Sequence, residues 1–158
     1  MEIVHIAAFA VQGASVRSNN ALELTGQGKL GALWAAFYAA APDMQQGAYG
    51  VYTDYESDAS GDYTVSAGLK VHAASAQGGA GVCQIEAGAY LVFPAQGAMP
   101  QAMLAAWQSV WAYFAQANCP HQRRYASDFE HYASAVSGAL YIGIQTALDG
   151  SAEGAPEL

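Results

Sequence analysis

The chain has 158 residues, with 13 acidic and five basic side chains and a formal net charge of −8. Because the charge is negative and no basic cluster is longer than Arg123-Arg124, we expect no direct nucleic-acid binding. Cys83 and Cys119 lack the spacing of a zinc site or a disulfide framework, so we expect neither a metal nor a cofactor.

The first half of the chain predicts a strand, a helix and a hairpin. Residues 3–11 are rich in β-branched and aromatic side chains and predict the strand. From residue 28, apolar residues recur every three or four positions, which predicts a helix that Pro42 ends. Residues 48–56 and 63–72 predict two strands, because turn-forming residues separate them.

The second half predicts the same order of elements. Residues 82–93 predict a strand, and Pro100 lies at the start of a helix that extends to about residue 117. Residues 123–132 and 139–146 predict a closing hairpin. Each half is therefore a predicted β-α-β-β unit, and the predicted fold class is α+β with an antiparallel sheet and two main helices.

Short motifs recur between the halves at a spacing of about 75 residues. The pairs are Gly13 and Gly88, Trp34 and Trp111, Asp54 and Asp128, and Gly68 and Gly143, with offsets of 75, 77, 74 and 75. Four matches in one order predict an internal duplication, with copies at about 1–75 and 80–146. We expect Trp34 to superpose on Trp111, and Glu56 on Glu130.

The two copies are predicted to form a single domain over residues 1–148. The glycine-rich segment 73–81 is the predicted linker between them, and residues 149–158 predict a disordered tail. The amino terminus lacks a basic stretch before its apolar residues, so it is not typical of a signal peptide. No uncharged stretch reaches the roughly 20 apolar residues of a membrane span. We therefore expect a cytoplasmic protein that does not contact a membrane.

The predicted helices carry unusually little charge. The second, over residues 101–117, has no charged residue, and the first has only Lys29. An exposed helix face normally carries charges. The pattern indicates either a homodimer interface or an exposed face rich in alanine and glutamine.

No catalytic motif is present, but an acid lies among aromatic residues near the end of the chain. Strand alternation places Glu130 and Tyr132 on one face, and Phe129 and His131 on the other. Aromatic rings and a carboxylate together can bind an aromatic cation through stacking, cation–π attraction and charge. The alternative for Glu130 is a solvated strand acid, and for the tryptophans it is ordinary core packing.

Several motifs together resemble the GyrI-like effector-binding domain. The motifs occur in order over residues 1–146: Gly13, Ser15-x-Arg17-x-x-Asn20, Leu33-Trp34-x-x-Phe37, Gly50 to Glu56, Ile85 to Phe93, Trp107-x-x-x-Trp111-x-Tyr-Phe114, Tyr125 to Tyr132, and Tyr141 to Ile144. This domain is the ligand-sensing half of AraC-type regulators and of the BmrR and Rob regulators. The domain also occurs as free-standing proteins, and this chain looks like such a protein, similar to those encoded on mobile gene cassettes.

The resemblance implies two units related by a pseudo-two-fold axis, with bulky, flat and often cationic amphiphiles bound in the groove between them. It implies that Glu130 faces the ligand. Further ligand-binding residues expected from the resemblance or from topology are aromatic: Tyr90, Trp111, Tyr141, Phe9, Tyr52 and Trp107. Family regulators carry a DNA-binding domain, and none is recognised here, so we expect a stand-alone, non-enzymatic multidrug-binding protein.

Two alternatives stay open at this point. Some relatives hydrolyse reactive small molecules, and Glu130 with Trp111 or Tyr141 could orient an attacking water in the same way. The family's name also suggests interaction with gyrase or another protein partner, which an acidic surface would suit.

Overall fold

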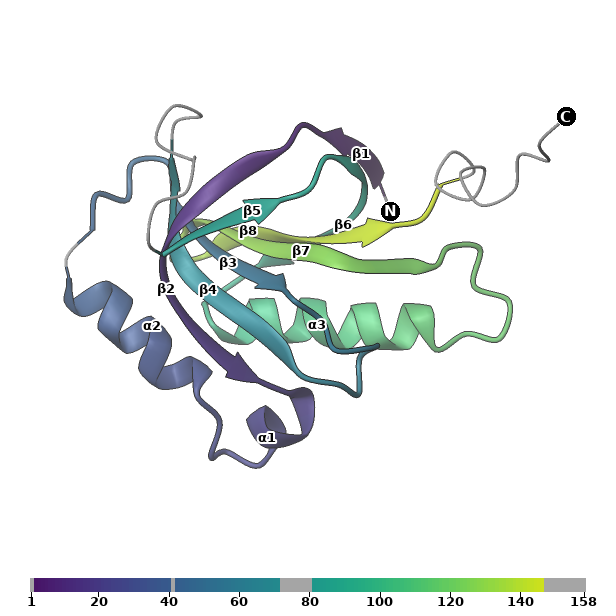
Figure 1. Cartoon of the computed structure of the whole chain (residues 1–158), viewed down its shortest axis with the longest axis horizontal. Helices are drawn as coiled ribbons and strands as arrows, with labels where there is room; N and C mark the ends of the chain where they lie inside the picture. The colour runs from purple at the N-terminus through teal and green to yellow at the C-terminus, as the bar shows by residue number, and fades with distance from the viewer. Residues whose placement is uncertain (1, 41, 72–80, 147–158) are drawn as a thin grey trace, which may run out of the picture.

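The computed structural model describes residues 2–40, 42–71 and 81–146 (Figure 1). The predicted linker, apart from Gly81, and the predicted tail lie outside the described residues. The strands are β1 (Glu2–Ile6), β2 (Phe9–Ser18), β3 (Ala48–Thr53), β4 (Tyr63–Val71), β5 (Val82–Ile85), β6 (Gly88–Gln96), β7 (Arg123–Ser134) and β8 (Ser137–Ile144). The helices are α1 (Asn20–Leu24), α2 (Leu30–Ala39) and α3 (Gln101–Phe114).

The described strands form one curled antiparallel sheet, with the order β1-β6-β8-β7-β3-β4-β2-β5 (Figure 1). Strands β3 and β7 are neighbours at its centre, and each borders the partner strand of its own hairpin. The units β2-α2-β3-β4 and β6-α3-β7-β8 are therefore arranged symmetrically about the centre of the sheet. This arrangement confirms the α+β fold with duplicated β-α-β-β units.

Each predicted first strand consists of two strands in the structure. The segment predicted at 3–11 divides into β1 and β2, and the segment at 82–93 divides into β5 and β6. Strand β1 pairs with β6 of the second unit, and β5 pairs with β2 of the first. Each unit thus contributes an edge strand beside the other unit. The break at 7–8 contains no glycine or proline, so no turn signal marked it in the sequence, whereas Gly88, with a φ of 151°, directly follows the break at 86–87.

The strand registers show that not all repeated motifs are equivalent. Gly13 pairs with Gly68, and a Cβ on either glycine would lie within about 2 Å of the partner backbone. In the second unit, however, Gly143 pairs with Tyr90 rather than with Gly88. The two glycine pairs therefore differ by two residues in register.

The expected superposition of Glu56 on Glu130 is wrong. Glu56 is exposed in the bend after β3, whereas Glu130 is buried within β7 and pairs with Gly50. The positive φ of 50° at Asp54 takes the chain out of the strand conformation before Glu56 is reached. The matching sequences at Glu56 and Glu130 therefore form a loop in the first unit and a strand in the second.

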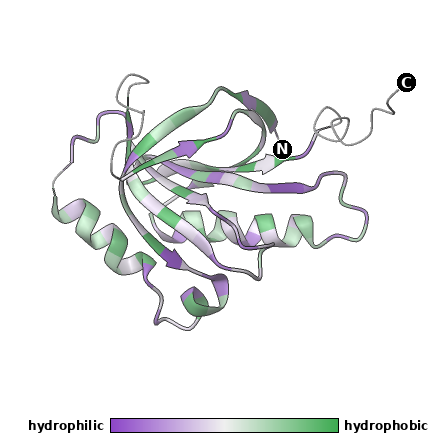
Figure 2. Cartoon of the chain, viewed as in Figure 1, coloured by the Kyte–Doolittle hydropathy of each residue, from purple (hydrophilic) through white to green (hydrophobic). Residues whose placement is uncertain are grey.

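The helices and the second face of the sheet enclose separate cores. On the helix-covered face, Val110 of α3 packs over Leu140 and Ile142, and Leu33 of α2 packs near Val65. The opposite face buries another cluster of large side chains, Val11, Val51, Ile85, Tyr90 and Phe129. Figure 2 shows mainly hydrophobic or neutral residues along α2 and α3. No helix within the described ranges is long and apolar enough to cross a membrane.

Candidate functional site

A cavity of about 340 Å³ lies between α1 and α3 on the helix-covered face. Its volume falls in the range of roughly 300–1,000 Å³ that is typical of small-molecule sites. Most of its walls are aromatic or aliphatic, and polar side chains come from α1 and the start of β7. The residues are Asn20, Glu23, Leu24, Gly26, Leu30, Tyr52, Tyr55, Ala59, Tyr63, Leu104, Trp107, Trp111 and Arg123.

Local structure explains how these elements meet. Asn19 begins α1 by accepting a hydrogen bond from the Leu22 amide at 2.7 Å. The α1 segment is held to the β3–β4 hairpin, because the Tyr63 hydroxyl donates to Asn20 Oδ1 at 2.8 Å. On the other side, Trp107 packs against both helix-side cores and lies 4.9 Å from the Tyr52 ring. The cavity therefore lies where the two units meet.

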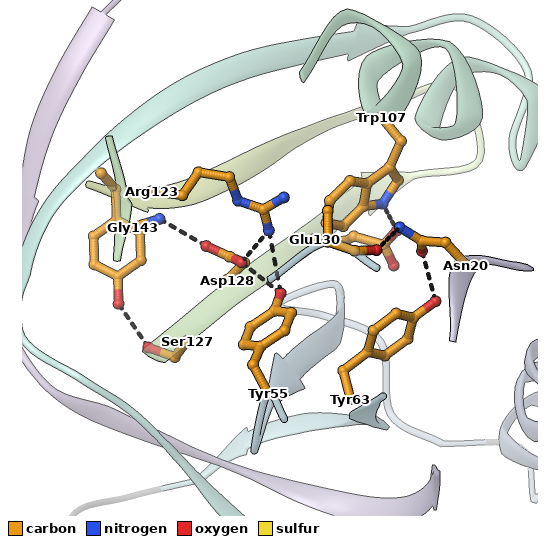
Figure 3. A network of polar contacts seen from close by, with 11 residues as sticks. Asn20, Tyr55, Tyr63, Trp107, Arg123, Ser127, Asp128, Glu130 and Gly143 are labelled. Carbon is orange, nitrogen blue, oxygen red and sulfur yellow. Dashed lines mark hydrogen bonds and ion pairs between the residues drawn. The ribbon is translucent and has the colours of Figure 1, made fainter. Parts of the chain in front are cut away.

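Glu130 lies directly behind the aromatic wall of this cavity (Figure 3). Its side chain is only 3% exposed and accepts hydrogen bonds from Trp107 Nε1 at 2.8 Å, the Tyr132 hydroxyl at 3.1 Å and the Tyr52 hydroxyl at 3.4 Å. Trp107 and Tyr52 line the cavity themselves. A molecule stacked on either ring would therefore be one side chain away from the carboxylate.

No cationic side chain of the described residues forms an ion pair with Glu130. Among the described residues, its carboxylate has no Lys, Arg or His nitrogen within 4 Å. Burial raises the pKa of Glu130 to about 7, although the hydrogen bonds from Trp107, Tyr132 and Tyr52 oppose the increase. At neutral pH the site therefore holds a buried acid that is ready to ionise beside a positive charge.

A second buried acid, Asp128, is compensated within the protein (Figure 3). Arg123 Nη2 lies 2.7 Å from Asp128, and the Gly143 amide donates to the same carboxylate at 2.8 Å. The Tyr55 hydroxyl also donates to Asp128. The Arg123 guanidinium in turn lies 4.4 Å from the Tyr125 ring centroid. Asp128 thus differs from Glu130 in having its own cation.

The structure brings four of the sequence-predicted site residues together. Tyr52, Trp107 and Trp111 line the cavity, and Glu130 contacts two of them. An adjoining cavity of about 350 Å³ shares Trp111 and Arg123 with the first. Trp111 therefore borders both cavities.

The other three predicted residues lie on the opposite face of the sheet. Phe9, Tyr90 and Tyr141 pack around Phe129, with ring centroids at 5.3, 5.5 and 4.5 Å from it. Because side chains alternate along β7, Phe129 points away from Glu130. Tyr141, which pairs with Phe129, follows it to that face. These residues belong to a separate aromatic core and do not line the cavity.

Sequence reasoning missed several residues of the cavity wall: Asn20, Glu23, Leu24, Tyr55, Tyr63 and Arg123. Three of them belong to α1, a five-residue helix that is too short for a helical period to appear. The signal that was available is the capping residue Asn19, followed by Glu23.

Comparison with known proteins gives consistent matches over nearly the whole chain. The family model described as "Integron-associated effector binding protein" matches residues 2–144. An integron cassette protein from the mobile metagenome of Vibrio cholerae is 38% identical, with 91% of this chain and 95% of that chain covered and a TM-score of 0.80.

A more distant relative and a solved structure of the same fold extend the comparison. YobU of Bacillus subtilis strain 168, a candidate transcriptional regulator, is 27% identical over 157 residues, which cover 92% of this chain and 96% of YobU. The structure of SAV2435 bound to tetraphenylphosphonium is similar in fold, with 18% identity, coverage of 94% and 95%, and a TM-score of 0.71.

Proposed function

The chain belongs to the family of integron-associated effector binding proteins, and on this basis we propose that it binds bulky aromatic cations between α1 and α3 without converting them. Binding of a small molecule follows from membership in an effector-binding family. The cationic, aromatic class of ligand is our proposal. The observation that carries it is the buried carboxylate of Glu130, which has no cationic partner among the described residues and lies behind an aromatic wall.

The physical argument begins with the energy of a buried charge. An ionised carboxylate without a counter-ion is unfavourable in a protein interior, so it either takes up a proton or pairs with a cation. The hydrogen bonds from Trp107, Tyr52 and Tyr132 reduce this penalty but supply no full positive charge. A cation against the Trp107 ring would supply that charge, and cation–π attraction would add about 0.5–2 kcal/mol.

The bound relative supports the same class of ligand. SAV2435 holds tetraphenylphosphonium, a bulky cation with four aromatic rings, and it shares the fold of this chain. A molecule of that kind has aromatic rings that Tyr52 and Trp107 would contact. It also carries a positive charge that would pair with the Glu130 carboxylate.

A hydrolase is the second candidate, because the pKa of about 7 at Glu130 suits a general base. Against this candidate, Glu130 does not line the cavity, and its carboxylate is already engaged by three donors. We therefore place binding first.

The test compares two ligands of the same shape. 10-Methylacridinium and 9-methylanthracene differ essentially in one positive charge, and both are fluorescent. In fluorescence titrations at physiological salt, we expect the cation to bind at least ~10-fold more tightly. Equal affinities would overturn the proposal. Mass analysis of a reactive electrophile, an aryl epoxide, after incubation should return it unchanged, whereas a diol formed by addition of one water molecule would favour the second candidate.

A further inference from the structure

A second uncompensated carboxylate, Glu23, lies on the wall of the same cavity. Its side chain is half-buried, and its oxygens accept hydrogen bonds from the Ser18 hydroxyl and from the amides of Lys29 and Leu30, the last two at 2.9 and 3.1 Å. The Lys29 ammonium is directed elsewhere, to the Arg17 carbonyl at 2.8 Å. Within the part of the chain that the structure describes, Glu23 has no cationic side chain within 4 Å.

Glu23 already has a structural role, because its two backbone contacts satisfy amides at the start of α2. Amides at a helix start carry only partial positive charge. The negative charge of Glu23 is therefore only partly neutralised, and a cation can still pair with it. This is the same condition as at Glu130, where the donors are also neutral.

Tyr63 lies near both acids. Its ring is 5.3 Å from the ring of Tyr52, which contacts Glu130, and its hydroxyl bonds to Asn20 on the Glu23 side of the cavity. Burial raises the pKa of Tyr63, and the negative charges of Glu23 and Glu130 raise it further. Tyr63 is thus within electrostatic reach of both carboxylates.

We propose that Glu23 is a second cation-binding residue and that the cavity prefers elongated dications, with an aromatic cationic head near Trp107 and Glu130 and a second cationic centre beside Glu23. The placement of the head rests on the proposed function. The second centre rests on Glu23 itself, since Asp128, the other acid nearby, is already paired with Arg123.

The test uses wild-type protein and pairs of acridinium ligands. Each carries an alkyl chain of three to eight carbons at the ring nitrogen, which ends either in trimethylammonium or in its uncharged carbon isostere, tert-butyl. At one or more chain lengths, we expect the dication to bind about fivefold more tightly than the isostere. Equal affinities at every length would overturn the inference.

Two variants test whether Glu23 is responsible for the preference for the dication. Glu23→Gln should bring the dication and its isostere to equal affinity, because it removes the charge that distinguishes the two ligands. Glu56→Gln is the matched control, because it removes the same charge from an exposed bend outside the cavity. An equal effect in both variants would indicate general attraction to an acidic protein and would overturn the role of Glu23.

The outcomes separate this inference from the proposed function. If wild-type protein binds the tert-butyl ligand tightly and shows no preference for the dication, only the second site is wrong. If neither ligand binds, the proposed function and this inference both fail. Circular dichroism checks the fold of Glu23→Gln, and the wild-type ligand comparison decides the matter if that variant unfolds.

Discussion

The indole N–H of Trp107 donates to Glu130 at 2.8 Å and thereby joins α3 to the central strand β7. The same tryptophan lines the cavity. One side chain therefore offers a ring surface to a ligand and a hydrogen bond to the acid behind it. Although Glu130 is only 3% exposed, this hydrogen bond allows its charge to act on a ligand that contacts Trp107.

Replacing Glu130 by glutamine should separate charge recognition from shape recognition. The amide keeps the size of the side chain, and the Tyr52 and Tyr132 hydroxyls can rotate to accept hydrogen bonds from it. We expect 10-methylacridinium to lose about 2–4 kcal/mol, or ~30- to 1,000-fold in affinity, in fluorescence titrations.

The binding of 9-methylanthracene to Glu130→Gln should change by less than about threefold, because this ligand carries no charge. Comparable losses for both ligands would mean that Glu130 shapes the cavity rather than pairing with a cation.

The contribution of Glu130 to the stability of the free protein should decrease as the pH rises. Burial raises the pKa of Glu130 from 4.5 to about 7, so between these pH values the folded protein binds more protons than the unfolded chain. The contribution of Glu130 to the free energy of unfolding is therefore present below about pH 4.5 and lost as the pH approaches 7. The total loss should be on the order of 3 kcal/mol.

Urea denaturation of the wild type and of Glu130→Gln at several pH values isolates this contribution from that of other groups. The difference between the two free energies of unfolding should change between about pH 4.5 and 7 and stay constant above it. A difference that is independent of pH would show that Glu130 is ionised throughout.

Cation affinity should have the opposite dependence on pH. Because the cation pairs with the ionised carboxylate, its affinity should rise about tenfold per pH unit up to about pH 7 and then become constant. Trp107→Phe removes a hydrogen bond that lowers the pKa of Glu130, so this midpoint should move to higher pH. An unchanged midpoint in Trp107→Phe would argue against Glu130 as the titrating group.

Arg123→Met should destabilise the fold strongly, because it leaves Asp128 buried and unpaired. Breaking a buried ion pair in this way typically lowers the free energy of unfolding by about 3–5 kcal/mol, which urea denaturation can measure. Arg17→Met is the control, since Arg17 is exposed, and its loss should amount to less than about 1 kcal/mol. Similar losses in both variants would contradict a structural role for the Arg123–Asp128 pair.

Tyr141→Leu tests the assignment of the two aromatic faces. It removes a ring stacked on Phe129 at 4.5 Å, so the free energy of unfolding should fall by about 1–2 kcal/mol. Acridinium affinity should stay within about twofold, because Tyr141 is not among the cavity residues. Trp111→Leu, on the cavity wall, should lower affinity about tenfold. A large loss of affinity in Tyr141→Leu would place the ligand on the other face.

The sequence by itself determined the local elements and the chemistry near Glu130. Periodicity located α2 and α3, turn residues located the hairpins, and the repeated order gave the α+β duplication. Strand alternation already separated Phe129 from Glu130. Periodicity, turns and strand alternation depend on residues a few positions apart, and the duplication depends on comparing one half of the sequence with the other, so a single sequence displays all of them directly.

Only the tertiary structure decided which aromatic residues share a site with Glu130. The Tyr52 hydroxyl that contacts Glu130 is 78 residues away in the chain, and Phe9, Tyr90 and Tyr141 proved to lie on the other face. Three other features also depend on long-range pairing: the exchange of β1 and β5 between units, the register of the paired glycines, and the position of Glu23 on the cavity wall. Such pairing is fixed by packing of the whole sheet and its helices, and no local spacing in the sequence encodes it.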